Sequence, residues 1–245
     1  MRLEFSFCIT DLITVNSPVS SPAGIVYSTN PHLAEAVNGK TYFVKGPQPE
    51  IVFSEIAGCL LSASLAIPVP AVALCSAEAN KFAGSEKVEH AFRDASVPLK
   101  KPENIVNIQD LYNVIVVDSW LGNTDRNLGN VLAVTSGEKL ALVMIDFEKS
   151  AALRPSPRIQ SSLIEPRNLW PTAELGEYAK RMKPLYPPPA ILKMIRETTE
   201  ERCRNILQPL LNALDSVTWA DDSIGALVTR GGNIDKIVEA VWRSR

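Results

Sequence analysis

Residues 121–147 constrain the fold most, because a short polar loop there joins an apolar helical pattern to an apolar hairpin pattern. The loop, LGNTDRNLGNVL, places Asn, Asp and Arg side chains between two apolar segments. The stretch that follows, VLAVTSGEKLALVMIDF at 131–147, has two apolar runs around Ser-Gly-Glu, which predicts a β-hairpin. Because a hairpin brings its ends together, we expect Asn130 before the first strand and Asp146 after the second to be neighbours.

Strand patterns occupy the beginning of the chain and helical patterns the end. Strands are expected at 3–15, 24–28, 41–45 and within 67–75, and helices at 50–66, 105–123, 188–214 and 233–243. The polar or proline-rich stretches 77–104 and 150–171 are expected to be loops. This order predicts an α+β fold with a small β-rich lobe (1–76), a connecting segment (77–104), a larger helical lobe (105–245) and a ligand crevice between the lobes.

Composition excludes several other classes of protein. The chain has 245 residues, 46% of them hydrophobic and 21% charged, as in ordinary globular domains rather than disordered ones. Its net charge of −2 argues against a dedicated nucleic-acid binder. Four scattered cysteines and two histidines give no zinc-binding pattern. We therefore expect a cytoplasmic protein with reduced cysteines, no signal peptide and no membrane span.

The polar loop and the hairpin end offer the groups that phosphoryl transfer needs. That chemistry uses oxygen ligands for magnesium and a carboxylate beside the attacking hydroxyl. Asn130 and Asp146 could share the metal ion, and Asp125, five residues before Asn130, could receive the proton. The alternative is structural, since Asp and Asn often do no more than turn a loop.

The β-rich lobe offers groups that suit phosphate. Lys45 closes an apolar strand, and Glu55 in the following helix could fix its position. The small-residue loop SPVSSPAG at 17–24, which includes Ser20, Ser21 and Gly24, could present backbone N–H groups to phosphate. Taken singly, Lys45 and Glu55 also suit solvated surface charges, and Ser20 and Ser21 suit plain loop serines.

These segments resemble the HipA-like kinases and the related phosphatidylinositol 3/4-kinase-type atypical kinases. The resemblance rests on GNTDRNLGNVL, LVMIDFE, YFVKG and FSEIAGCLLSASLAIPVPAVAL, and it covers about residues 20–150. It implies a two-lobed protein-kinase-like fold that uses ATP and Mg²⁺. It also implies that Lys45 contacts ATP phosphates, that Glu55 pairs with Lys45, that Asp125 is the catalytic base, and that Asn130 and Asp146 bind magnesium.

The acceptor of the phosphoryl group is less constrained. The resemblance implies a Ser/Thr hydroxyl of a protein partner, in a toxin–antitoxin setting, with Ser20 and Ser21 as candidate autophosphorylation sites. An inositol lipid or a small molecule is the alternative acceptor. Because the expected phosphate loop holds a single glycine, Gly24, a nucleotide-binding pseudokinase or interaction module without turnover is a further alternative.

Overall fold

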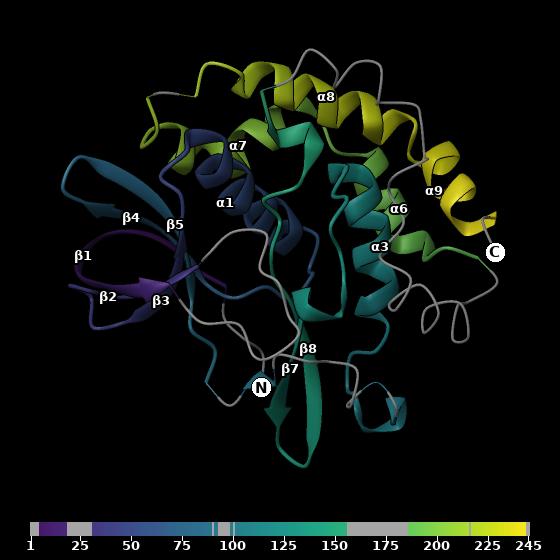
Figure 1. Ribbon diagram of the computed structural model, residues 1–245. Helices are drawn as coiled ribbons and strands as arrows, with labels where there is room; N and C mark the ends of the chain where they lie inside the picture. The colour runs from purple at the N-terminus through teal and green to yellow at the C-terminus, as the bar shows by residue number, and fades with distance from the viewer. Residues whose placement is uncertain are drawn as a thin grey trace.

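The computed structural model describes residues 5–18, 31–89, 91–92, 99, 101–155, 186–215 and 217–243, which form a mixed α+β fold (Figure 1). The strands are β1 (Phe7–Pro18), β2 (His32–Ala36), β3 (Thr41–Lys45), β4 (Val72–Ala77), β5 (Asn80–Glu86), β6 (Ala91–Phe92), β7 (Val131–Ser136) and β8 (Lys139–Met144). The α-helices are α1 (Pro49–Ser64), α3 (Asp110–Leu121), α6 (Pro189–Arg196), α7 (Glu200–Leu211), α8 (Ala220–Gly232) and α9 (Ile234–Arg243). Short 3-10 turns are η1 (Pro102–Asn104), η2 (Leu128–Asn130) and η3 (Ala151–Leu153).

The first five strands close into a small barrel in the order β1-β2-β3-β5-β4. Neighbouring strands are antiparallel except β1 and β4, whose parallel pairing closes the barrel. Its interior is filled by a compact cluster of small and aromatic side chains: Ala34, Ala36, Tyr42, Val44, Ala73 and Cys75. Lys45 is the last residue of β3, so it lies at one end of the barrel.

Helix α1 lies between the barrel and the C-terminal helices (Figure 1). Pro49 occupies its first turn, where the missing N–H costs nothing. Residues 52–62 are buried without interruption, because the helix packs against β4 and β5 on one side and against α3 and α7 on the other. One main hydrophobic core therefore runs from the barrel wall through α1 into the helical part.

Helix α3 is the centre of the helical part, and α8 crosses its C-terminal end. The Nε1 of Trp120 donates to the carbonyl oxygen of Leu227 at 2.8 Å. The buried Arg230 guanidinium donates to the carbonyl oxygens of Trp120 and Ser119. Burial lowers the pKa of Arg230 to about 10. The two Arg230 bonds satisfy carbonyls at the end of α3 that have no partner within the helix.

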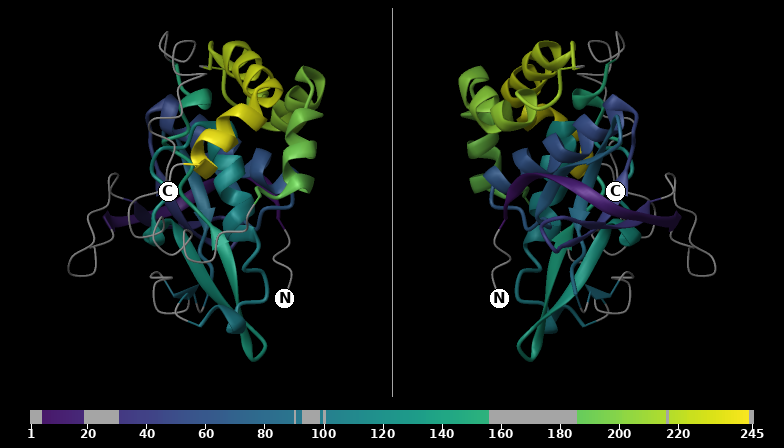
Figure 2. Two further views of the ribbon diagram at one scale, coloured as in Figure 1. Left: turned by 90° about the vertical axis from the view of Figure 1, so that its right-hand side faces the viewer. Right: turned by 90° about the vertical axis from the view of Figure 1, so that its left-hand side faces the viewer.

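Strands β7 and β8 form the expected hairpin, with β6 added to its edge. The turn is Gly137-Glu138, between the paired residues Ser136 and Lys139, and Gly137 has a φ of 64°. The hairpin extends away from the helices, as the two side views in Figure 2 show. Its open end returns Met144 opposite Val131, which brings the segments before and after the hairpin together.

Several expectations from the sequence are confirmed. Strand β3 has the bounds predicted for it, and α1 and the β7–β8 hairpin lie where the patterns placed them. The predicted strand at 24–28 and the part of the predicted loop after residue 155 lie outside the described residues.

Other boundaries were wrong. The stretch 77–104 was predicted to be a loop, yet it contains β5, because β5 fills the gap between β3 and β4 and so completes the barrel. The single helix predicted at 188–214 is two helices, because the Thr199 side chain accepts a bond from the N–H of Arg202 and begins α7 anew. Helix α3 begins at Asp110 rather than at residue 105, since Ile105 bridges to Leu140 beside β8.

Among the helices in the described ranges, none combines the length and the apolarity that a bilayer crossing requires.

We predict that Gly122→Ala lowers the free energy of unfolding by about 1 kcal/mol, because Gly122 ends α3 with a φ of 67°, which disfavours side chains with a Cβ. Gly225→Ala is the matched control: in the exposed interior of α8, with nothing within 4 Å of the added Cβ, it should raise stability by about 0.5–1 kcal/mol. Urea denaturation of both variants tests whether their free energies of unfolding change in opposite directions. Equal effects would contradict this account of the helix end.

Candidate functional site

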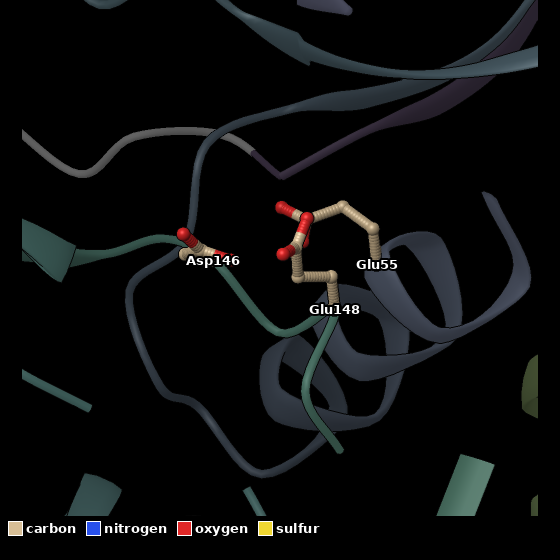
Figure 3. A group of neighbouring side chains, drawn as sticks. All are labelled: Glu55, Asp146 and Glu148. Atoms are coloured by element: carbon tan, nitrogen blue, oxygen red, sulfur yellow. The ribbon is translucent and has the colours of Figure 1, made fainter. Parts of the chain in front are cut away.

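The Lys45 ammonium lies among three carboxylates that come from two other parts of the chain. Its Nζ is 2.8 Å from Asp146 Oδ1, 3.4 Å from Glu55 Oε2 and 3.4 Å from Glu148 Oε2. Figure 3 shows Glu55 projecting from α1 toward Glu148, with Asp146 beside them on the segment that follows β8. The barrel, α1 and the hairpin end thus meet at one charged cluster.

Helix α1 is fastened to the segment 146–148 by polar contacts and by a close approach. Glu55 Oε2 accepts the backbone N–H of Phe147 at 2.9 Å, and the Ser54 hydroxyl donates to the carbonyl oxygen of Glu148 at 2.9 Å. A Cβ added at Gly58 would lie 2.4 Å from the Cβ of Phe147. Only glycine at position 58 therefore allows α1 to come near enough for Glu55 to reach this backbone.

The electrostatics of the cluster keep the lysine charged. Burial by itself would lower the pKa of Lys45, but the charges of Glu55, Asp146 and Glu148 outweigh it and hold that pKa above its usual range. Burial raises the pKa of Glu55, and the nearby Lys45 charge opposes that rise. A charged ammonium held at the end of a strand can bind phosphate.

The polar loop after α3 is folded around its own amide groups. The Asn130 Nδ2 donates to the carbonyl oxygen of Asp125 at 2.6 Å, and the Asp125 N–H donates to Asn123 Oδ1 at 3.2 Å. The carboxylate of Asp125 is half-buried, and its pKa is raised by burial and by the charge of Asp146. The loop therefore holds the Asn130 side chain against the backbone of Asp125.

Arg126 joins this loop to the end of the hairpin. Its guanidinium, which is 1% exposed, pairs with both carboxylate oxygens of Asp118 on α3 at 2.8 and 3.1 Å. It also donates to the carbonyl oxygens of Asn130 and Ile145, and it stacks 4.7 Å from the ring centroid of Phe147. Although burial opposes the charge, Asp118 raises the pKa of Arg126.

The residues present fit a magnesium ion in their donor chemistry. Magnesium prefers carboxylate and amide oxygens, and Asp146 and Asn130 supply one of each. The amide nitrogen of Asn130 is engaged with Asp125, so Oδ1 is the ligand atom that Asn130 can offer. Glu55, Asp146 and Glu148 can also place one carboxylate oxygen each within 4.8 Å of one another. Asp146 has a φ of 66°, in the left-handed region that residues other than glycine adopt uncommonly.

The structure thus brings together Lys45, Glu55 and Asp146, and separately Asp125 and Asn130. The backbone joins the two groups, since the N–H of Ile145 donates to the carbonyl oxygen of Asn130 at 3.1 Å. The catalytic and metal-binding roles assigned to these five residues remain predictions. The expected phosphate-loop residues Ser20, Ser21 and Gly24 lie outside the described residues.

Sequence reasoning missed two residues of the site. Asp118 stands in the apolar stretch VIVVDSW, and a carboxylate in such a run signals a buried cationic partner. Glu148 follows Asp146 by two residues, so an extended chain places both side chains on one side. Both signals were available, but neither by itself names the partner.

Comparisons with known proteins do not identify the chain. No family model and no curated protein matches it. A solved structure, the Helicobacter pylori proinflammatory kinase CtkA, is similar at 15% sequence identity over 95% of this chain and 97% of that one, with a TM-score of 0.48. At this level of likeness the two structures need not share a function.

We predict that Gly58→Ala destabilises the protein by about 1–3 kcal/mol, because the added methyl overlaps Phe147 and forces α1 outward. The loss should appear although alanine favours the helix. Thermal and urea unfolding measure it, and Gly225→Ala again provides the same substitution in open space. A stabilised Gly58→Ala variant would show that α1 does not depend on this approach.

We further predict that Arg126→Met lowers the free energy of unfolding by about 3–5 kcal/mol, because it leaves the buried Asp118 carboxylate without its cation. Arg204→Met is the comparison, since the exposed Arg204 pairs with Glu200 and Asp221 in contact with water, which screens the charges. Its effect should be clearly smaller in the same denaturation assay. Similar losses from both variants would refute the role given to the buried pair.

Proposed function

We propose that this chain is an ATP- and Mg²⁺-dependent phosphotransferase of the HipA-like kind, with a two-lobed kinase-like arrangement and a protein Ser/Thr hydroxyl as acceptor. The main support is the position of the Lys45 ammonium, 2.8 Å from Asp146 and 3.4 Å from Glu55. Three elements that are distant in sequence meet there with the residue types that phosphoryl transfer requires. The acceptor class rests on the sequence resemblance alone.

In this proposal the cluster around Lys45 binds the nucleotide phosphates. Lys45 provides the positive charge, and Glu55 orients it from α1. Glu55 is itself held by the N–H of Phe147, so its carboxylate has a fixed position before a ligand arrives. Preorganised charges of this kind need no rearrangement when the reaction begins.

Asp125, Asn130 and Asp146 take the remaining roles. Asn130 and Asp146 hold the metal ion, which when bound neutralises charge on the phosphate oxygens. Asp125 accepts the proton of the acceptor hydroxyl, and its raised pKa makes it a better base than an exposed aspartate. Arg126 keeps the loop and the hairpin end in register through its bonds to the carbonyls of Asn130 and Ile145.

We predict that Asp146→Asn reduces phosphoryl transfer at least about 100-fold while the fold is retained, because it removes a charge that faces the metal ion and Lys45. Transfer of radiolabelled phosphate from ATP is measured to the protein itself, to lysate proteins and to inositol-lipid vesicles. Circular dichroism checks the fold, and Asp11→Asn on the exposed surface of β1 is the control.

Undiminished transfer by the Asp146→Asn protein would contradict the assignment. Transfer to vesicles alone would favour the inositol-lipid alternative. Wild-type protein that binds ATP with magnesium in calorimetry, yet transfers phosphate to no acceptor and not to itself, would favour a nucleotide-binding module.

A further inference from the structure

Glu148 occupies a position that the proposed chemistry leaves unexplained. Phosphoryl transfer of this kind uses one glutamate to orient the lysine, and Glu55 supplies it. Yet Glu148 Oε2 lies as near to Lys45 Nζ as Glu55 does, at 3.4 Å. Lys45 therefore has a second glutamate partner, on the segment that also carries Asp146.

The side chain of Glu148 is completely buried. It is 0% exposed, against 12% for Lys45 and 17% for Asp146. Its backbone carbonyl accepts the Ser54 hydroxyl at 2.9 Å and the Arg154 Nε at 2.8 Å, so the residue is anchored at the main chain. Its other oxygen, Oε1, lies 3.8 Å from the Lys149 ammonium. A carboxylate placed in this way stays beside Lys45.

The charges around Lys45 do not balance. With the carboxylates of Glu55, Asp146 and Glu148 ionised, the ammonium groups of Lys45 and Lys149 leave an excess of one negative charge. Arg126 does not remove the excess, because its guanidinium is bound to Asp118. A nucleotide phosphate that approaches Lys45 must therefore compete with carboxylates that already hold it, within a field that repels phosphate.

We propose that Glu148 is a positioning residue that competes with nucleotide phosphate for Lys45 and thereby makes nucleotide binding depend on a divalent cation. This inference rests on the proposed function, since it concerns the same site. A divalent cation supplies positive charge to a cluster in which negative charge is in excess. Without the cation, Lys45 remains with its carboxylates and phosphate binds weakly.

The experiment compares the affinity for ATP with and without Mg²⁺, the latter in EDTA, by calorimetry on the full chain. For Glu148→Gln, which keeps the shape and removes the charge, we expect tighter binding of metal-free ATP than in the wild type. We define the ratio as the dissociation constant of ATP in EDTA divided by that in Mg²⁺. In Glu148→Gln this ratio should be at least about fivefold smaller than in the wild type, which is the lower end of typical coupling between ligands. Metal chelation by ATP in solution is the same for both proteins and cancels in the comparison.

Glu86→Gln is the matched control, because Glu86 pairs with Lys40 at 2.7 Å on the outside of the barrel and does not contact the cluster. It should leave the ratio unchanged. Should Glu148→Gln fail to fold, Glu148→Asp keeps the charge but withdraws it by one methylene, and it should lower the ratio by a smaller factor. Unfolding curves of each variant establish that the folded protein is being measured.

The remaining outcomes overturn one proposal or the other. An unchanged ratio in a folded Glu148 variant would refute the inference about Glu148. Weaker binding confined to the Mg²⁺ condition would also refute it, since Glu148 would then act as a metal ligand. Wild-type protein that binds no ATP under either condition would instead refute the proposed function.

Discussion

The buried ion pair between Arg126 and Asp118 is the interaction on which the site depends. Burying two charges is costly unless every polar atom finds a partner, and Arg126 meets that condition with both Asp118 oxygens and with the carbonyls of Asn130 and Ile145. Those carbonyls belong to the start and the end of the β7–β8 hairpin. The Arg126 side chain therefore fixes the distance between the polar loop and the segment that carries Asp146. It is itself held in place by Asp118 on α3.

Helix α1 provides the second constraint, and it works through the backbone. Ser54 and Glu55 bond to main-chain groups of Glu148 and Phe147, while Gly58 removes the Cβ that would keep the helix away. Since α1 also packs against β4 and β5, any movement of the helix would carry the barrel and Lys45 with it. The position of Lys45 relative to Asp146 is thus set by packing along α1 rather than by the ion pair alone.

The sequence predicted the parts of this arrangement that depend on local pattern. Turn chemistry at Ser136–Glu138 was enough to place Asn130 and Asp146 at the same end of a hairpin. The helical spacing predicted the helix that carries Glu55, whereas its pairing with Lys45 was implied by the resemblance to HipA-like kinases. Strand β5 was missed because its sequence, NKFAGSE, is polar and becomes a strand only when β3 and β4 offer edges to pair with. The apolar run around Asp118 signals a buried cation but does not say which one, because a partner eight residues away across a helix end follows from tertiary packing.

The triplet Asp146-Phe147-Glu148 shows why an apolar residue can decide the electrostatics of its neighbours. Phe147 is fully buried between Gly58 and the Arg126 guanidinium, while the residues on either side of it both contact Lys45. Its packing anchors the segment between α1 and Arg126, so both carboxylates lie beside Lys45 although they repel each other. The backbone at Asp146, with its positive φ, is held in that conformation by the same packing. The hydrophobic core therefore keeps both carboxylates beside Lys45, and with them the excess of negative charge at that position.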